Sequence, residues 1–167
     1  MYSIGEYISY GNSGVCEVIG TSEMSGQASD LPKRICYILQ PVHDKSCRIM
    51  TPVDNTKVVM RNLITKEETQ ELLADIPQIE PLPSQSARQQ ELSYQKALHS
   101  GDCREWISLI KTLRGRIETR KEKGKKITAT DDRYFRAVTE KLTEEFSIVL
   151  GMDAEKTKEM LEDAFTS

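Results

Sequence analysis

The 167-residue chain is 38% hydrophobic and 29% charged, with a formal net charge of −3, which is typical of one ordinary globular domain or two small ones. Its apolar runs are only a few residues long, whereas roughly 18 apolar residues are needed to span a bilayer. The first residues lack the basic start and apolar block of a signal peptide. We therefore expect a cytoplasmic protein without a membrane segment.

The sequence has no pattern that is typical of an active site or a metal site. Its four cysteines (Cys16, Cys36, Cys47 and Cys103) are scattered, and His43 adds only one more ligand near Cys47, whereas structural zinc takes four. Nucleophile-elbow, phosphate-loop and zincin motifs are missing, and two histidines supply little acid–base chemistry near neutral pH. We expect no enzymatic activity, no metal and no cofactor.

Residues 1–64 have the pattern of a small β domain. Turn residues and prolines separate short runs of β-forming residues at 6–10, 15–20, 35–40, 47–51 and 57–60, with a polar loop through Asp30 after the second run. Five short strands in about sixty residues predict a small, strongly bent barrel of SH3 or Tudor type. Such a barrel is usually a binding module, and an exposed strand edge accepts a strand from a partner. The sequence leaves open whether 47–51 is an edge strand or an internal one.

A helix and a proline-rich connection follow the β domain. Thr65 and Glu68 have the spacing of a capping box, which predicts a helix to about residue 75. Three prolines, at 77, 81 and 83, then favour an extended segment. We place the domain boundary in this segment, at 76–84.

Residues 86–167 predict a bundle of about four antiparallel helices joined by short loops, at 87–99, 103–123, 131–150 and 154–165. Asp102, Asp153 and either Thr128 or Thr130 are suitable N-caps. The predicted fold class is therefore α+β, a small SH3/Tudor-like β-barrel followed by an all-α helical bundle.

Trp106 is the only tryptophan, and two interpretations compete for it. A planar side chain serves minor-groove proteins as a wedge between DNA bases. Trp106 shares one helical face with Leu109, Ile110, Leu113 and Ile117, however, and that spacing is typical of a core position. We therefore predict that Trp106 is buried.

Residues 104–136 are basic although the whole chain is acidic. This segment has eleven cations against five acids. A basic surface of this kind suits a polyanion such as nucleic acid. The alternative is a solvated helix face with Glu/Lys pairing, which most runs of charge are.

Short motifs along the chain resemble one family. The order of the motifs is the strongest part of the resemblance, and they are IGEYISY (4–10), GVCEVI (14–19), CRIMTPV (47–53), VMRNLI (59–64), LHSGD (98–102) and ITATDDRYF (127–135). The chain resembles the CarD/CdnL family of bacterial transcription regulators, whose N-terminal domain is shared with the transcription–repair coupling factor. The resemblance implies a monomer that binds RNA polymerase holoenzyme and stabilises the melted promoter, without a cofactor.

The resemblance also implies a different role for each part of the chain. Residues 1–64 would be a Tudor-like domain that binds the polymerase β subunit, 65–85 a helix and connection, and 86–167 a helical domain on promoter DNA. The expected polymerase-binding residues are Cys47, Arg48, Ile49, Met50 and Thr51. The expected DNA-binding residues, mostly for phosphates, are Arg88, Arg114, Arg116, Arg120, Lys121, Lys123, Lys125, Lys126, Arg133 and Arg136.

The chain departs from the family at two surfaces. The family usually has a wedge tryptophan near the start of the first C-terminal helix, where this chain has Ala87, although the following Arg88 can enter a minor groove electrostatically. Ser22 and Met50 stand at about the positions of polymerase-facing arginines. A longer basic loop around 120–126 offers compensating phosphate contacts. Two functions therefore stay open, a bridge between polymerase and promoter or a protein-interaction module without effective DNA contact.

Overall fold

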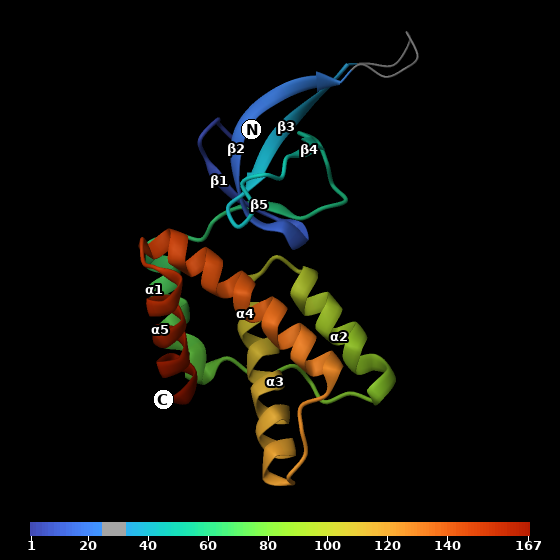
Figure 1. The fold of residues 1–167 in the computed structure, drawn as a ribbon, viewed down its shortest axis with the longest axis vertical. Helices are drawn as coiled ribbons and strands as arrows, with labels where there is room; N and C mark the ends of the chain where they lie inside the picture. The colour runs from blue at the N-terminus through green and yellow to red at the C-terminus, as the bar shows by residue number, and fades with distance from the viewer. Residues whose placement is uncertain (25–32) are drawn as a thin grey trace. The chain divides into compact units, whose positions relative to one another are not determined.

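The computed structural model describes residues 1–24 and 33–167, and the predicted polar loop lies mostly outside this part of the chain (Figure 1). The chain divides into two compact units, Met1–Leu63 and Ile64–Ser167. Within the described residues, an antiparallel five-stranded sheet is followed by five α-helices. The predicted α+β class is therefore confirmed.

The first unit is one antiparallel sheet with the strand order β4-β3-β2-β1-β5. The strands are β1 (Tyr7–Tyr10), β2 (Gly14–Met24), β3 (Arg34–Pro41), β4 (Ile49–Pro52) and β5 (Met60–Asn62). All five lie near the predicted positions. The second strand is longer than predicted, because its register with β3 continues to the pair Met24–Arg34.

The sheet is open in the described residues, because β4 and β5 are its two edge strands and no ladder joins them. The predicted SH3/Tudor-like barrel is therefore not confirmed. One side of the sheet carries a small apolar core of Ile8, Cys16, Val18, Tyr37 and Leu39, all at most 2% exposed. Alternation along each strand puts the neighbouring side chains on the opposite side.

The second unit consists of α1 (Lys66–Asp75), α2 (Ala87–His99), α3 (Cys103–Glu122), α4 (Ala129–Leu150) and α5 (Ala154–Thr166). The predicted capping box is present: the Thr65 hydroxyl accepts from the Glu68 amide, and the Glu68 carboxylate accepts from the Thr65 amide. Asp102, Thr128 and Asp153 cap α3, α4 and α5. No helix in the described residues is long and apolar enough to span a membrane.

Trp106 lies in the core of the helical unit, as predicted. Its side chain is 2% exposed, and its indole N–H donates to the Leu98 carbonyl at 3.1 Å. Leu109, Ile110 and Leu113 of the predicted face are buried with it. Trp106 is thus a packing residue of α3.

The proline-rich segment packs against the helical core, which the sequence did not predict. Ile76 and Ile79 are buried in the same core as Trp106, and the Leu82 amide donates to the Thr112 hydroxyl of α3 at 2.8 Å. In Figure 1 this segment crosses α3 on its way from α1 to α2. We call residues 76–85 the strap. The strap belongs to the helical unit, and the first unit ends at Leu63, within one residue of the expected first domain, 1–64.

Candidate interaction surfaces

Strand β4 carries most of the predicted polymerase-binding residues and lies at an edge of the sheet. Within the described residues, β4 pairs only with β3. Thr51 is 1% exposed and accepts a hydrogen bond from the Asn55 amide group, whereas Met50 is 49% exposed. On this edge strand the side chain of Met50 is therefore exposed and that of Thr51 is buried.

The backbone N–H and carbonyl groups of successive β4 residues also alternate, pointing toward β3 and then away from it. The Val53 amide donates to the Ile35 carbonyl at 3.0 Å, so residues 53, 51 and 49 direct their backbone groups toward β3. Met50 and Pro52 then direct theirs toward the open edge, and Pro52 has no N–H. Met50 is thus the residue of β4 whose N–H can pair with an added strand.

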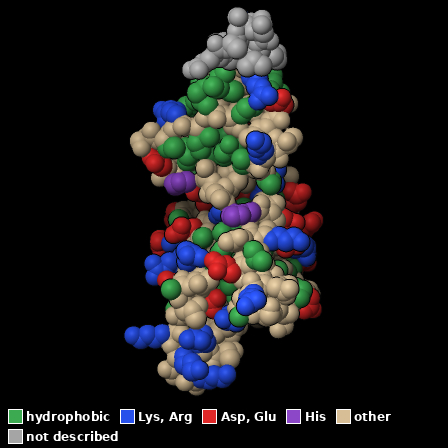
Figure 2. All heavy atoms as spheres, turned by 90° about the vertical axis from the view of Figure 1, so that its right-hand side faces the viewer, with side chains coloured by type: hydrophobic (Ala, Val, Ile, Leu, Met, Phe, Trp, Pro, Cys, Tyr) green, Lys and Arg blue, Asp and Glu red, His purple; other side chains and the backbone are tan. Residues whose placement is uncertain are grey.

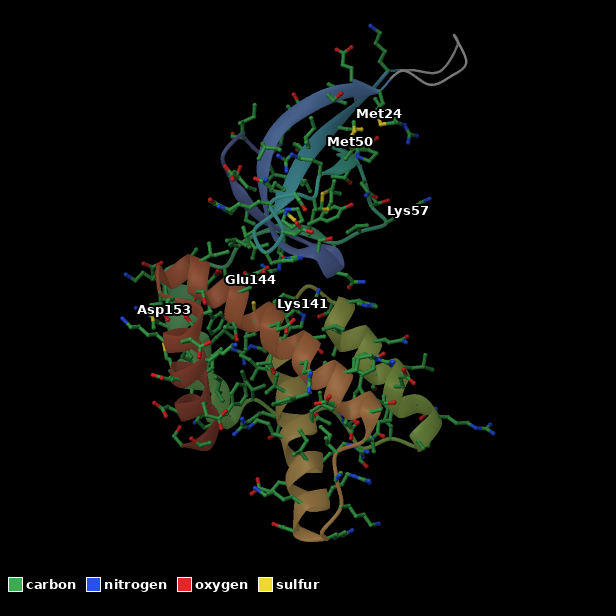
Figure 3. All side chains as sticks on the ribbon, viewed as in Figure 1. Met24, Met50, Lys57, Lys141, Glu144 and Asp153 are labelled. Atoms are coloured by element: carbon green, nitrogen blue, oxygen red, sulfur yellow. The ribbon has the colours of Figure 1, made fainter. Side chains whose placement is uncertain are left out.

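The solvent side of β4 and its neighbours is apolar. Met50 lies opposite Ile38 of β3, and Met24 at the end of β2 is 51% exposed. Figure 3 shows Met24 and Met50 on the same side of the unit. Methionine side chains adapt to irregular partner surfaces, so this side suits a protein contact.

Arg48 and Cys47 lie in the turn before β4 rather than in the strand. The Arg48 guanidinium is exposed and donates to the Lys45 carbonyl at 2.8 Å and the Cys47 carbonyl at 3.1 Å. No carboxylate pairs with Arg48 in the part of the chain that the structure describes. Its charge is therefore available beside the open edge.

Five of the ten predicted DNA-binding residues gather at one end of the helical unit. We call residues 120–126 the basic tip; it contains one acid, Glu122, and the cations Arg120, Lys121, Lys123, Lys125 and Lys126. Residues 121–126 are all exposed. Figure 2 shows Lys and Arg side chains gathered at this end of the unit.

The tip has a defined backbone. Gly124 has φ +70°, its amide donates to the Lys121 carbonyl at 3.0 Å, and the Lys125 amide donates to the Arg120 carbonyl at 2.8 Å. These two bonds form a Schellman motif, which ends α3 and turns the chain back. The Arg120 guanidinium also donates to the Lys126 carbonyl at 2.7 Å. The cations are thus held on a closed turn rather than on a loose loop.

Four other predicted DNA-binding arginines are engaged in ion pairs within the helical unit. The pairs are Arg114–Glu162, Arg116–Asp131, Arg133–Glu91 and Arg136–Asp132. The Arg114 guanidinium donates two hydrogen bonds to the Glu162 carboxylate, and this contact lowers the pKa of that carboxyl. Glu162 and Glu91 lie outside residues 104–136, so they neutralise charge that the count along this segment did not balance, whereas Asp131 and Asp132 were already among its five acids.

Arg88 and Ala87, the first residues of α2, are both exposed. Ala87 occupies the position at which the family resemblance expected a wedge, and it offers only a methyl group. Trp106 does not substitute for the wedge, because it is buried. Any contact of the start of α2 with DNA would therefore be electrostatic and made by Arg88.

A family model described as the CarD-like/TRCF RID domain matches residues 2–64. The chain carries a CarD-like RID domain. The predicted resemblance is thereby confirmed over these residues, and the RID domain is a type of domain that interacts with RNA polymerase. A comparison with curated proteins finds no match to the chain.

The match ends where the first compact unit ends, within one residue of Leu63. The open edge of β4 is therefore an edge of the RID domain itself. The basic tip lies in the helical unit, outside the matched residues. No cluster of three or more His, Cys, Asp or Glu suited to a metal ion occurs among the described residues.

Sequence reasoning missed a groove in the helical unit. The groove has a volume of about 540 Å³ and lies between the strap, α2 and the C-terminal half of α3. Its walls meet only because the strap folds back onto α3, so no local motif marks it. The excess of cations in α3 was the one available signal.

Proposed function

We propose that this protein is a transcription regulator that binds the RNA polymerase β subunit through its RID domain and promoter DNA through the basic tip. It would act in the cytoplasm as a monomer, without a cofactor, and would modulate the stability of the open promoter complex. The observation that carries this proposal is the open β4 edge on a CarD-like RID domain.

Polymerase binding is supported by the geometry of β4. A partner strand added to this edge would pair with the outward N–H and carbonyl of Met50, and main-chain pairing supplies affinity in such complexes. The exposed side chains of Met24 and Met50 would pack on the partner, and Arg48 would lie beside it. In this proposal Ile49 and Thr51 hold β4 on the sheet, and Cys47 belongs to the turn. The proposed RID domain is Tudor-like in strand number and curvature, without requiring a closed barrel.

DNA binding is supported by the charge of the tip. Among the ten predicted residues, Arg88 and the five tip cations have no carboxylate partner in the described part of the chain. We therefore narrow the proposed DNA surface to these six. The four ion-paired arginines would have to give up an existing partner before they could bind a phosphate.

A second function is supported by Ala87. Without an aromatic wedge, the helical unit would have no side chain to hold unstacked bases at the bubble edge. The protein would then be an interaction module that binds polymerase without effective DNA contact. In the main proposal the basic tip is needed for the effect on the open complex after polymerase has bound, whereas in the interaction module it is not.

The lifetime of open promoter complexes, with and without the protein, tests the main proposal. We expect a longer lifetime with the wild type and a loss of that effect in Lys125→Glu/Lys126→Glu. The matched control is Lys156→Glu/Lys158→Glu, which changes the net charge equally on exposed residues of α5. An unchanged lifetime despite polymerase binding would favour the interaction module.

The polymerase contact has its own test. Met50→Pro removes the outward N–H of β4, whereas Met50→Ala keeps the N–H and removes only the side chain. If strand addition carries the contact, capture of polymerase by Met50→Pro falls well below capture by Met50→Ala. Capture by Met50→Pro at the wild-type level would place the contact elsewhere on the RID domain.

A further inference from the structure

The groove between the strap, α2 and α3 is large enough for a small molecule. Its volume of about 540 Å³ lies within the roughly 300–1,000 Å³ that is typical of ligand sites. One wall is apolar and consists of Pro81, Leu82 and Pro83 of the strap, and Tyr94 of α2 also lines the groove. An apolar wall of this kind suits a flat ring.

The strap wall is fixed by hydrogen bonds to α3. The Leu82 amide donates to the Thr112 hydroxyl at 2.8 Å. The Lys111 ammonium group donates to the Ile79 carbonyl at 2.7 Å and also to the Ile76 carbonyl. The groove therefore exists before any ligand arrives, and a ligand would not have to order this wall.

The groove is positively charged. Lys111, Arg116, Arg120 and Lys123 line it, and no Asp or Glu does. Arg116 is paired with Asp131, whereas the other three have no carboxylate partner among the described residues. Lys111 and Arg120 are oriented by backbone carbonyls, which leave their positive charge in place. The groove thus offers an apolar wall together with three unneutralised cations.

Gly115 lines the groove beside open space. A Cβ built on Gly115 meets no atom within 4 Å, and its φ is not in the left-handed region, so the backbone does not require glycine there. Glycine inside a helix costs about 1 kcal/mol relative to alanine. Neither packing nor backbone conformation requires glycine at this exposed position, so a side chain can be added there without a clash.

We infer that this groove binds a nucleoside phosphate, with the base against the strap prolines and the phosphates at Lys123 and Arg120. An inorganic anion would leave the apolar wall unused, and an uncharged ring would leave the cations unused. A DNA duplex is too wide for this volume. The inference goes beyond the proposed function and stands whether or not the tip binds DNA.

Calorimetric titration of the full chain with ADP and with GDP, without metal ions, tests the inference. We expect saturable 1:1 binding of at least one of them. Lys123→Gln removes a charge-assisted contact and should weaken binding about tenfold. The matched control is Lys121→Gln, which removes one charge from an exposed residue of α3 that does not line the groove and should leave the affinity unchanged.

Gly115→Leu gives a second test that changes no charge, because it adds a bulky side chain to the lining of the groove. Leucine is a good helix former, so α3 should persist, and circular dichroism checks this. We expect loss of nucleotide binding with unchanged DNA affinity. Wild-type nucleotide affinity in Gly115→Leu, equal weakening by Lys121→Gln, binding of pyrophosphate as tight as that of the nucleotides, or no nucleotide binding would each overturn the inference.

Discussion

The burial of Ile76 makes the strap testable as a part of the helical core. Ile76 is completely buried against residues of the helical unit. Truncating a buried isoleucine to alanine removes its transfer free energy and leaves a cavity, which together cost about 2–5 kcal/mol. For domains of 60–100 residues, each kcal/mol lowers the melting temperature by roughly 4–8 °C. Ile76→Ala should therefore lower the melting temperature of the helical unit by at least about 8 °C.

Trp106 makes the measurement specific to one unit. It is the only tryptophan of the chain and lies in the same core as Ile76. Its fluorescence during denaturant unfolding therefore reports the helical unit and not the RID domain. The control is Leu92→Ala, because Leu92 is an apolar residue of the same unit that is 64% exposed. Its loss should change the free energy of unfolding by no more than about 0.5 kcal/mol.

The comparison of the two variants decides the role of the strap. If the strap were only a connection between domains, Ile76→Ala would cost no more than Leu92→Ala. That result would refute the assignment of residues 76–85 to the helical core. It would also remove the fixed wall on which the nucleotide groove depends.

Three further predictions concern single residues. Thr65→Ala removes one half of the capping box and should cost about 1 kcal/mol in chemical denaturation of the helical unit. Gly124→Ala must hold a side chain at φ +70°, so it should cost roughly 1–2 kcal/mol in the same assay. Burial, and after it the negative charge of Asp131, raises the pKa of Tyr94 to about 12, above the ordinary value of 10.0. The folded state then favours the neutral phenol, so the contribution of Tyr94 to the free energy of unfolding is complete below pH 10 and is lost between pH 10 and about 12. In pH-dependent denaturation, the free energy of unfolding of Tyr94→Phe should therefore fall less over that range than that of the wild type.

The helices could be predicted closely because their signals are local. Thr65 and Glu68 are three residues apart, and the same short-range chemistry placed the caps at Asp102 and Asp153. The spacing of Trp106 with Leu109 and Leu113 likewise reports one face of one helix. Such patterns need no knowledge of the rest of the chain.

The packing of the strap could not be predicted, because proline rules describe only the backbone. Prolines at 77, 81 and 83 do prevent a long helix, and the segment is extended after a short 3₁₀ turn at Ile76–Gln78. The same rules say nothing about where an extended segment packs. Ile76 and Ile79 were the available signal, since two exposed isoleucines would be unusual in a linker.

The basic face was overestimated because a charge count along the sequence does not include distant partners. Arg114 pairs with Glu162, which is 48 residues away, and Arg133 pairs with Glu91, which is 42 residues away. Only the tip, where a short turn concentrates the cations, could be recognised from the sequence alone. The edge position of β4 was also beyond sequence reasoning, because the order of strands is a long-range property.

The chemistry of the tip limits what kind of promoter contact the proposed regulator can make. In the proposed function the lysines and arginines of the tip contact mostly phosphates, which fix position along the duplex but carry no sequence information. Ala87 removes the aromatic contact that would otherwise distinguish unstacked bases from an intact duplex. In the proposed function the helical unit therefore contributes attraction without selectivity. The choice of promoter must then come from the polymerase, and the RID domain, by binding polymerase, decides which DNA the tip meets.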